Sequence, residues 1–124
     1  MLRVFIADDS VAFGTLAAAW LETDAEVVVV GSVRSAAAAV AQVVDAAPDV
    51  VLLDRLLPQP EHSAAVFAHV REHLPDAAVI LLSGMPPLDL AREAATLGAD
   101  GSVSKATDAR GLLAAVRSAV AGVA

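Results

Sequence analysis

Five short apolar runs alternate along this chain with longer segments of helical periodicity, and this alternation constrains the fold more than any other feature. Four of the runs are continuously apolar, which is typical of strands that are covered on both faces. Strands that alternate with helices pair in parallel through right-handed crossovers, with helices on both faces of the sheet. We therefore predict an α/β fold of five βα units. The predicted strands are RVFIA, EVVVVGS, DVVLLD, AVILLS and GSVSK, near residues 2–7, 26–31, 49–53, 78–82 and 101–104.

The segments between the runs begin and end with residues that bound helices. Ser10 and Ser35 stand where N-caps are expected, because a serine hydroxyl accepts hydrogen bonds from the free N–H groups of a first turn. Pro48 and Pro75 follow two expected helix ends, and the stretch LGADG closes another helix. No linker or internal repeat interrupts the pattern. With 124 residues, the chain is predicted to form a single domain over residues 1–124.

Composition and charge exclude several functions. A hydrophobic content of 57% with only 3% aromatic residues indicates a folded core of small aliphatic side chains. A net charge of -7 opposes direct binding of nucleic acid, which needs clustered lysine and arginine. Without cysteine, neither a disulfide nor a thiolate metal site can form. The sequence shows no signal peptide and no apolar window of membrane-spanning length, so we expect a soluble, cytoplasmic domain.

Charged and polar side chains stand at the carboxyl ends of four of the predicted strands. Asp8 and Asp9 follow the first strand, and Asp54 ends the third. Ser83 ends the fourth strand and Lys105 the fifth. Ligands of parallel α/β sheets bind beyond the carboxyl ends of the strands. We therefore expect these five side chains to converge on one edge of the sheet, although they are far apart in sequence.

The predicted grouping points to a cation and to phosphoryl chemistry. Carboxylates that lie close together repel one another unless a cation lies among them, and hard oxygen ligands suit Mg²⁺. A carboxylate such as Asp54 can also act as a nucleophile and form an acyl phosphate. Lys105 would neutralise one phosphoryl oxygen, and the Ser83 hydroxyl would donate a hydrogen bond to another. We interpret the adjacent aspartates as the residues that hold the cation.

With these residues in place, the sequence resembles the receiver domain of two-component response regulators. The resemblance rests on the acidic pair in ADDS, Asp54 in LLDRLLP, Ser83 in LLSG and Lys105 in SVSK, in that order on five βα units. It covers nearly the whole chain. It implies a doubly wound, flavodoxin-like sheet with strand order 2-1-3-4-5. It also implies a signalling switch that catalyses its own phosphorylation and dephosphorylation, accepting the phosphoryl group on Asp54 from a histidine kinase or a small acyl phosphate.

The same resemblance implies roles for individual residues. Asp9 and Asp54 would bind Mg²⁺ directly, and Asp8 would hold it through a water molecule. The backbone carbonyl of Leu56 would complete the protein ligands. Ser83 and Lys105 would contact the phosphoryl group.

Three departures from the pattern of the family lie outside these residues. Ser102 stands where an aromatic residue usually precedes the lysine by three positions, and Ala106 stands where a proline usually follows it. The loop LPQPEHS keeps only Pro58 of the usual Pro, Gly and Asp. Loss of the proline after the lysine is found in the NarL/LuxR-type branch, which GSVSKATD resembles. That branch implies a transcriptional output domain, with DNA bound only through it, and a homodimer formed through the first and last helices.

Two functions other than a phosphorylated receiver are possible for this fold. A receiver fold that is never phosphorylated and acts only as a protein-interaction module would fit Ser102 and the altered loop, whereas the complete set of acidic and basic site residues opposes it. A flavin carrier would place the negatively charged flavin phosphate against the acidic cluster, which opposes this function.

His62, His69 and His73 share one predicted helix, and the last two have a spacing that can bind zinc. No carboxylate pattern completes such a site, so we interpret them as partly solvated surface histidines.

Overall fold

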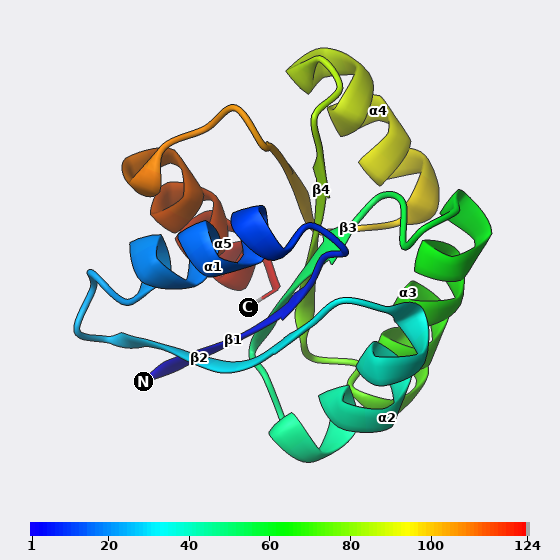
Figure 1. The fold of residues 1–124 in the computed structure, drawn as a ribbon, viewed down its shortest axis with the longest axis horizontal. Helices are drawn as coiled ribbons and strands as arrows, with labels where there is room; N and C mark the ends of the chain where they lie inside the picture. Colours follow the sequence, from blue (N-terminus) through cyan, green and yellow to red (C-terminus); the bar gives the residue numbers. More distant parts are fainter. Residues whose placement is uncertain (124) are drawn as a thin grey trace.

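The computed structural model describes residues 1–123 and confirms the predicted order of alternating strands and helices (Figure 1). The strands are β1 (Leu2–Ala7), β2 (Val27–Val33), β3 (Val50–Asp54), β4 (Ala78–Ser83) and β5 (Gly101–Ser104). The helices are α1 (Val11–Leu21), α2 (Ala36–Ala46), α3 (Pro60–His73), α4 (Pro87–Leu97) and α5 (Ala109–Val123). No helix within the described residues is long and apolar enough to cross a membrane.

All five strands are parallel and pair in the order β2-β1-β3-β4-β5, as the doubly wound fold requires. Ala7 pairs with Leu53, Asp54 with Leu82, and Ser83 with Ser104. The strands therefore end at one common edge of the sheet. This register is what brings residues from distant parts of the chain to the same place.

Helices cover both faces of the sheet, which explains why the strands carry so few polar residues. Val4 and Ile6 pack with the apolar side chains of α1 and α5, whereas Phe5 and Ala7 pack with those of α2 and α3. The helix α4 lies on the α3 side, where Leu90 and Ala94 pack with Leu81 of β4. Because successive strand residues point to opposite faces, every position of β3 and β4 is buried.

The strand β2 extends two residues beyond its predicted end. The prediction placed this end at Gly31, yet β2 continues to Val33 with a shift of register against β1. A side chain at Gly31 would place its Cβ 2.6 Å from the ring of Phe5, which lies in the adjacent strand. Gly31 therefore serves close packing of a side chain on the backbone of a strand, and it does not end that strand.

The helix boundaries follow the predicted signals. The Ser10 hydroxyl accepts a hydrogen bond from the Phe13 N–H at 3.2 Å, and the Ser35 hydroxyl accepts one from the Ala38 N–H at 3.1 Å. At the C-terminal end of α4, Gly98 adopts a left-handed conformation with φ 94°, which glycine enters without a steric cost. These caps fix where α1 begins, directly after the acidic pair.

Candidate functional site

Three aspartates gather at the carboxyl edge of the sheet, as predicted. Asp8 and Asp9 follow β1, and Asp54 is the last residue of β3. One carboxylate oxygen of each lies within 4.8 Å of the others. Asp8 and Asp54 are buried, with 2% and 5% of their surfaces exposed, whereas Asp9 faces solvent. Within residues 1–123 this is the one group of three side chains with the spacing of a metal site.

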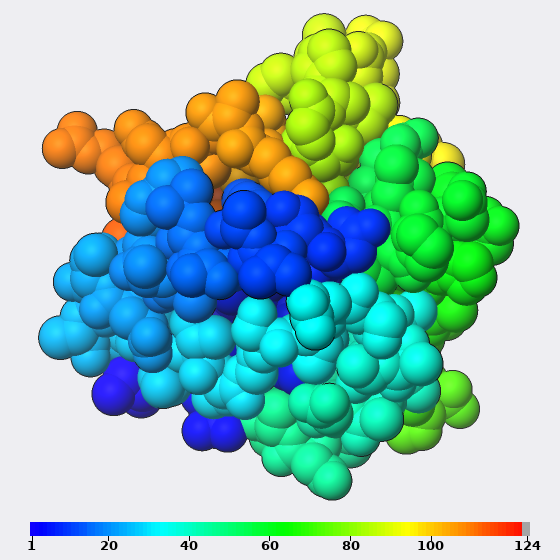
Figure 2. Space-filling view, in the orientation of Figure 1, coloured from blue at the N-terminus to red at the C-terminus, as the bar shows by residue number. Residues whose placement is uncertain are grey.

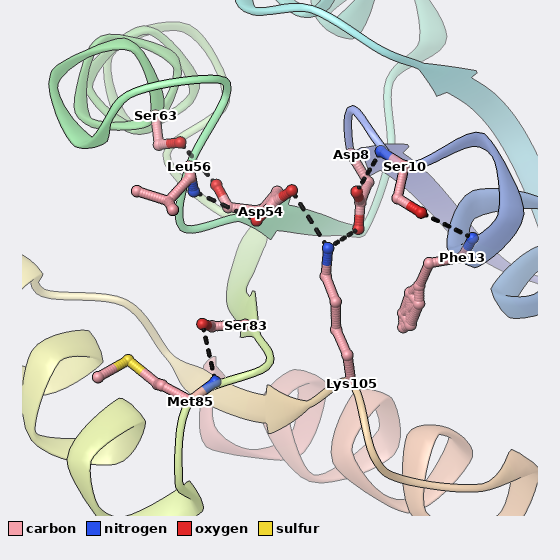
Figure 3. A network of polar contacts seen from close by, with 9 residues as sticks. All are labelled: Asp8, Ser10, Phe13, Asp54, Leu56, Ser63, Ser83, Met85 and Lys105. Carbon is pink, nitrogen blue, oxygen red and sulfur yellow. Dashed lines mark hydrogen bonds and ion pairs between the residues drawn. The ribbon is translucent and has the colours of Figure 1, made fainter.

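Lys105, the only lysine of the chain, reaches into this cluster from the end of β5 (Figure 3). Its ammonium nitrogen lies 2.7 Å from Oδ2 of Asp8 and 3.2 Å from Oδ2 of Asp54. The ion pairs join β5 to β1 and β3 across the intervening end of β4. In the space-filling view, the start of α1 (deep blue) accordingly lies against the segment that follows β5 (orange) (Figure 2).

Backbone groups hold the two buried carboxylates in place. Oδ1 of Asp8 accepts a hydrogen bond from the Ser10 N–H at 2.8 Å. Oδ1 of Asp54 accepts one from the Leu56 N–H at 3.2 Å. On each side chain, the other oxygen, Oδ2, is then left to face the lysine. The carboxylates are thereby oriented before any ligand enters the site.

Ser63 supports Asp54 from behind and was missed by the sequence analysis. Its hydroxyl donates a 2.6 Å hydrogen bond to the backbone carbonyl of Asp54, and the residue is 2% exposed. A signal was present, because Ser63 shares the buried stripe of α3 with Val66 and Val70. A polar residue on an apolar stripe must find a partner inside the protein.

The electrostatics of the cluster favour an added cation. Burial raises the pKa of Asp54 to about 7, and the charge of Asp8 adds to this, against the Leu56 hydrogen bond and Lys105. Burial alone would lower the pKa of Lys105, but its ion pairs with Asp8 and Asp54 raise it above its ordinary value. When all three aspartates are ionised, the single ammonium of Lys105 balances only one of their three negative charges. The donor set, hard oxygens with this excess charge, therefore fits a divalent ion such as Mg²⁺.

The other two predicted site residues lie at the same edge with different contacts. Ser83 is 9% exposed at the end of β4, and its hydroxyl accepts a 3.1 Å hydrogen bond from the Met85 N–H (Figure 3). Among the described residues, this hydroxyl forms no hydrogen bond with Asp54 or Lys105. Leu56 contributes its N–H to Asp54, and the role of its carbonyl as a metal ligand stays a prediction.

Ser102 and Ala106 leave an open groove between α4, β5 and α5. The groove has a volume of about 370 Å³ and is lined by small side chains, among them Ser104 and Ala115. Pro87, at the start of α4, forms part of the groove wall, and the next residue, Leu88, is 65% exposed. The small side chains of Ser102 and Ala106 therefore shape the face formed by α4, β5 and α5, and the groove does not include the acidic cluster.

The histidines lie together on α3, away from the acidic cluster. His62 and His73 are exposed, and His69 is half-buried. The rings of His69 and His73 lie 4.3 Å apart between centroids, and Nδ1 of His73 is 3.0 Å from the carbonyl oxygen of His69. All three are therefore at least partly exposed to solvent, as predicted.

A doubly wound parallel sheet with an acidic cluster and a lysine at its carboxyl edge defines the class of receiver-like signalling domains. The sequence profile of the response regulator receiver domain matches residues 4–117. The chain therefore belongs to the response regulator receiver domain family.

Solved structures of the same family superpose closely on this chain. The signal receiver domain of a response regulator designated NarL from Mycobacterium tuberculosis has a TM-score of 0.84 and 29% identity, covering 98% of this chain and 97% of that one. A two-component response regulator of the LuxR family from Aurantimonas sp. SI85-9A1 has a TM-score of 0.84 and 25% identity, covering 97% and 85%. A CheY-like receiver domain from Methanospirillum hungatei JF-1, at 20% identity, a TM-score of 0.82 and 99% and 96% coverage, shares the fold. The neighbours thus extend beyond the NarL/LuxR-type branch.

Curated proteins match over part of the chain. The protein-glutamate methylesterase/protein-glutamine glutaminase of Nitrobacter hamburgensis is 45% identical over 58 residues, which make up 47% of this chain and 15% of that protein. The protein of the same description from Rhodopseudomonas palustris (strain HaA2) is 40% identical over 65 residues, or 52% and 17%. This chain therefore corresponds to a small part of these relatives' length.

Proposed function

We propose that this receiver accepts a phosphoryl group on Asp54 in an Mg²⁺-dependent reaction and acts as a signalling switch. The donor is the phosphohistidine of a histidine kinase or a small acyl phosphate. The proposal depends above all on one observation, the buried Asp54 carboxylate that lies 3.2 Å from the only lysine and within 4.8 Å of two further acids.

The residues of the chain divide the chemistry among them. A carboxylate oxygen of Asp54 forms a bond to phosphorus while the bond from phosphorus to the donor's nitrogen or oxygen breaks, and the donor leaves with that electron pair. The Lys105 ammonium neutralises charge on the phosphoryl oxygens, and the Ser83 hydroxyl turns from the Met85 N–H to donate a hydrogen bond to one of them.

The acidic cluster supplies the metal ligands in this proposal. Asp9 and Asp54 would hold Mg²⁺ directly, Asp8 through a water molecule, and the Leu56 carbonyl would complete the set. When bound, the ion would neutralise and orient the phosphoryl oxygens. The unbalanced negative charge of the three carboxylates supports this assignment.

The phosphorylated form would be lost slowly by hydrolysis. Leu56, which is 38% exposed beside Asp54, puts an apolar side chain at the entrance to the site. Met85, two residues after Ser83, packs against the side chains of α4 and points away from Asp54 (Figure 3). The expected slow hydrolysis therefore depends on Leu56, which would restrict the access of water to Asp54. Rapid loss of the phosphoryl group would refute this expectation.

The output of the switch is proposed to be transcriptional. The similarity to NarL-type and LuxR-family receivers supports a DNA-binding output domain in the same regulator and homodimerisation through α1 and α5. The net charge of -7 argues against direct DNA binding by this domain, which we take to span residues 1–124 and to act in the cytoplasm.

Mass spectrometry of the intact protein tests the proposal. After incubation with acetyl phosphate and Mg²⁺, the wild type should gain the mass of one phosphoryl group, and Asp54→Ala should not. A wild type that keeps its mass, while a known receiver gains mass under the same conditions, would favour the alternative of an unphosphorylated interaction module. The open groove beside Ser102 is the observation that supports that alternative.

A further inference from the structure

The ammonium of Lys105 has a third neighbour, the aromatic ring of Phe13, which the proposed chemistry does not use. Nζ lies over this ring at 5.2 Å from its centroid (Figure 3). Phe13 belongs to α1 and is only 8% exposed. A cation is attracted to the negative face of an aromatic ring, and more strongly where water is excluded.

The position of this ring is fixed relative to the acidic cluster. The Ser10 N–H donates a hydrogen bond to Asp8, and the Ser10 hydroxyl accepts one from the Phe13 N–H. Two hydrogen bonds thus connect the backbone of Phe13 to the carboxylate of Asp8. The ring also meets the single tryptophan, Trp20, in a T-shaped contact with centroids 6.5 Å apart and planes at 82°. The ring is therefore held between the site and the core.

Phe13 differs from the two carboxylates in its response to a divalent cation. Asp8 and Asp54 hold the ammonium through oxygens of the acidic cluster, so a cation held there competes for the same oxygens and repels the ammonium. The neutral ring of Phe13 offers no oxygen to a metal. Its attraction for the ammonium persists when that of the carboxylates is reduced.

We propose that Phe13 is a positioning residue whose ring face keeps the Lys105 ammonium beside Asp54, including when the acidic cluster holds a divalent cation. This inference rests on the proposed function of Asp54 as the phosphoryl acceptor. It adds a residue that touches neither metal nor phosphoryl group and acts only through Lys105.

Nuclear magnetic resonance tests the contact without any reaction. Because Lys105 is the only lysine, protein labelled with ¹³C-lysine gives one set of lysine signals. In the wild type the ring should shift the signals of the Lys105 Hε protons upfield, both with EDTA and with Mg²⁺. The shift should be lost in Phe13→Leu and kept in Phe13→Tyr. Unshifted signals in the folded wild type, or loss of the shift on adding Mg²⁺, would overturn the inference.

Fluorination of the ring tests the consequence for the reaction. Replacing Phe13 by phenylalanines with one, two and three fluorines weakens the negative face while nearly preserving the shape, so a folding defect is avoided. The rate of phosphorylation by acetyl phosphate should fall stepwise, by about two- to fivefold in total. The same substitutions in a Lys105→Met background should change nothing further.

Phe67 provides a matched control within the chain. Phe67 belongs to α3 and is not part of the acidic cluster. Its ring lies beneath a different cation, Arg71, with 4.8 Å between the guanidinium carbon and the ring centroid. Fluorinating Phe67 should leave the rate unchanged. Phosphorylation that is equally fast at every level of Phe13 fluorination contradicts the positioning role, whereas a wild type that is not phosphorylated at all contradicts the function of Asp54.

Discussion

Asp54 combines two properties that are in conflict in the metal-free protein, burial and negative charge. Only 5% of it is exposed, and burial together with Asp8 raises its pKa to about 7. The sequence predicted the position of Asp54 at the strand end, but the cost of ionising it depends on side chains that arrive from other strands. The function would use this conflict, because a carboxylate whose charge is only partly compensated attracts a cation, and that cation would then admit the negatively charged phosphoryl group.

Replacing Asp54 by asparagine should stabilise the metal-free protein in a pH-dependent way. A carboxyl whose pKa is raised from 3.8 to about 7 binds more protons in the folded than in the unfolded state between these pH values. Its contribution to the free energy of unfolding therefore falls as pH rises from about 4 to 7. In EDTA, Asp54→Asn should match the wild type near pH 4 and exceed it by about 4 kcal/mol at pH 8. Urea unfolding at several pH values measures the difference, and a difference independent of pH would contradict this explanation.

At the scale of helices and strands, the sequence was informative wherever local chemistry sets a boundary. The serine caps of α1 and α2 and the glycine after α4 were correctly predicted because their hydrogen bonds and dihedral angles are local. The end of β2 was predicted wrongly, since the role of Gly31 comes from Phe5 in a neighbouring strand. Ser63 was missed for a similar reason, because its partner is the backbone of Asp54. The hydroxyl of Ser83 was predicted in the correct place, but its bond to the Met85 N–H depends on a rotamer.

Gly31→Ala tests the packing of β2 on β1. The added Cβ would lie 2.6 Å from the ring of Phe5, which is 1% exposed and cannot move freely, so we expect a loss of about 1–3 kcal/mol in the free energy of unfolding. Gly122→Ala is the matched control, because a Cβ there meets nothing within 4 Å. Thermal or urea denaturation of both variants measures the effect. Equal stability of the two would show that the close approach of Phe5 does not constrain Gly31.

Ser63→Ala tests whether α3 supports the acceptor from behind. Removing the hydroxyl leaves the buried carbonyl of Asp54 without this partner, which should cost about 1–3 kcal/mol of stability. Ser63→Thr keeps the hydroxyl and serves as the comparison. Chemical denaturation of Ser63→Ala with no loss of stability would show that another group satisfies the carbonyl.

At the scale of the whole molecule, the parallel sheet is what creates the site. No two of Asp8, Asp54 and Lys105 are close in sequence, and each reaches the cluster because its strand ends at the same edge. Binding of an ion at this edge would therefore stabilise β1 and β3 together, because Asp8 and Asp9 follow β1 and Asp54 ends β3.

Magnesium should raise the melting temperature of the protein. A ligand that binds only the folded state adds about 2.7 kcal/mol of stability when present at one hundred times its dissociation constant. Calorimetry in Mg²⁺ and then in excess EDTA should show a reversible rise and fall, reduced in Asp9→Asn, which removes an exposed member of the cluster. An unchanged melting temperature at high Mg²⁺ would contradict a divalent site at this edge.

Localisation of the phosphoryl group shows whether Asp54 is the acceptor. After treatment with acetyl phosphate and Mg²⁺, borohydride converts a phosphorylated aspartate to homoserine, which tandem mass spectrometry assigns to one position. We expect homoserine at position 54 alone, and none when Mg²⁺ is replaced by EDTA. Homoserine at position 8 or 9, or an unmodified residue 54 in Mg²⁺, would contradict this expectation.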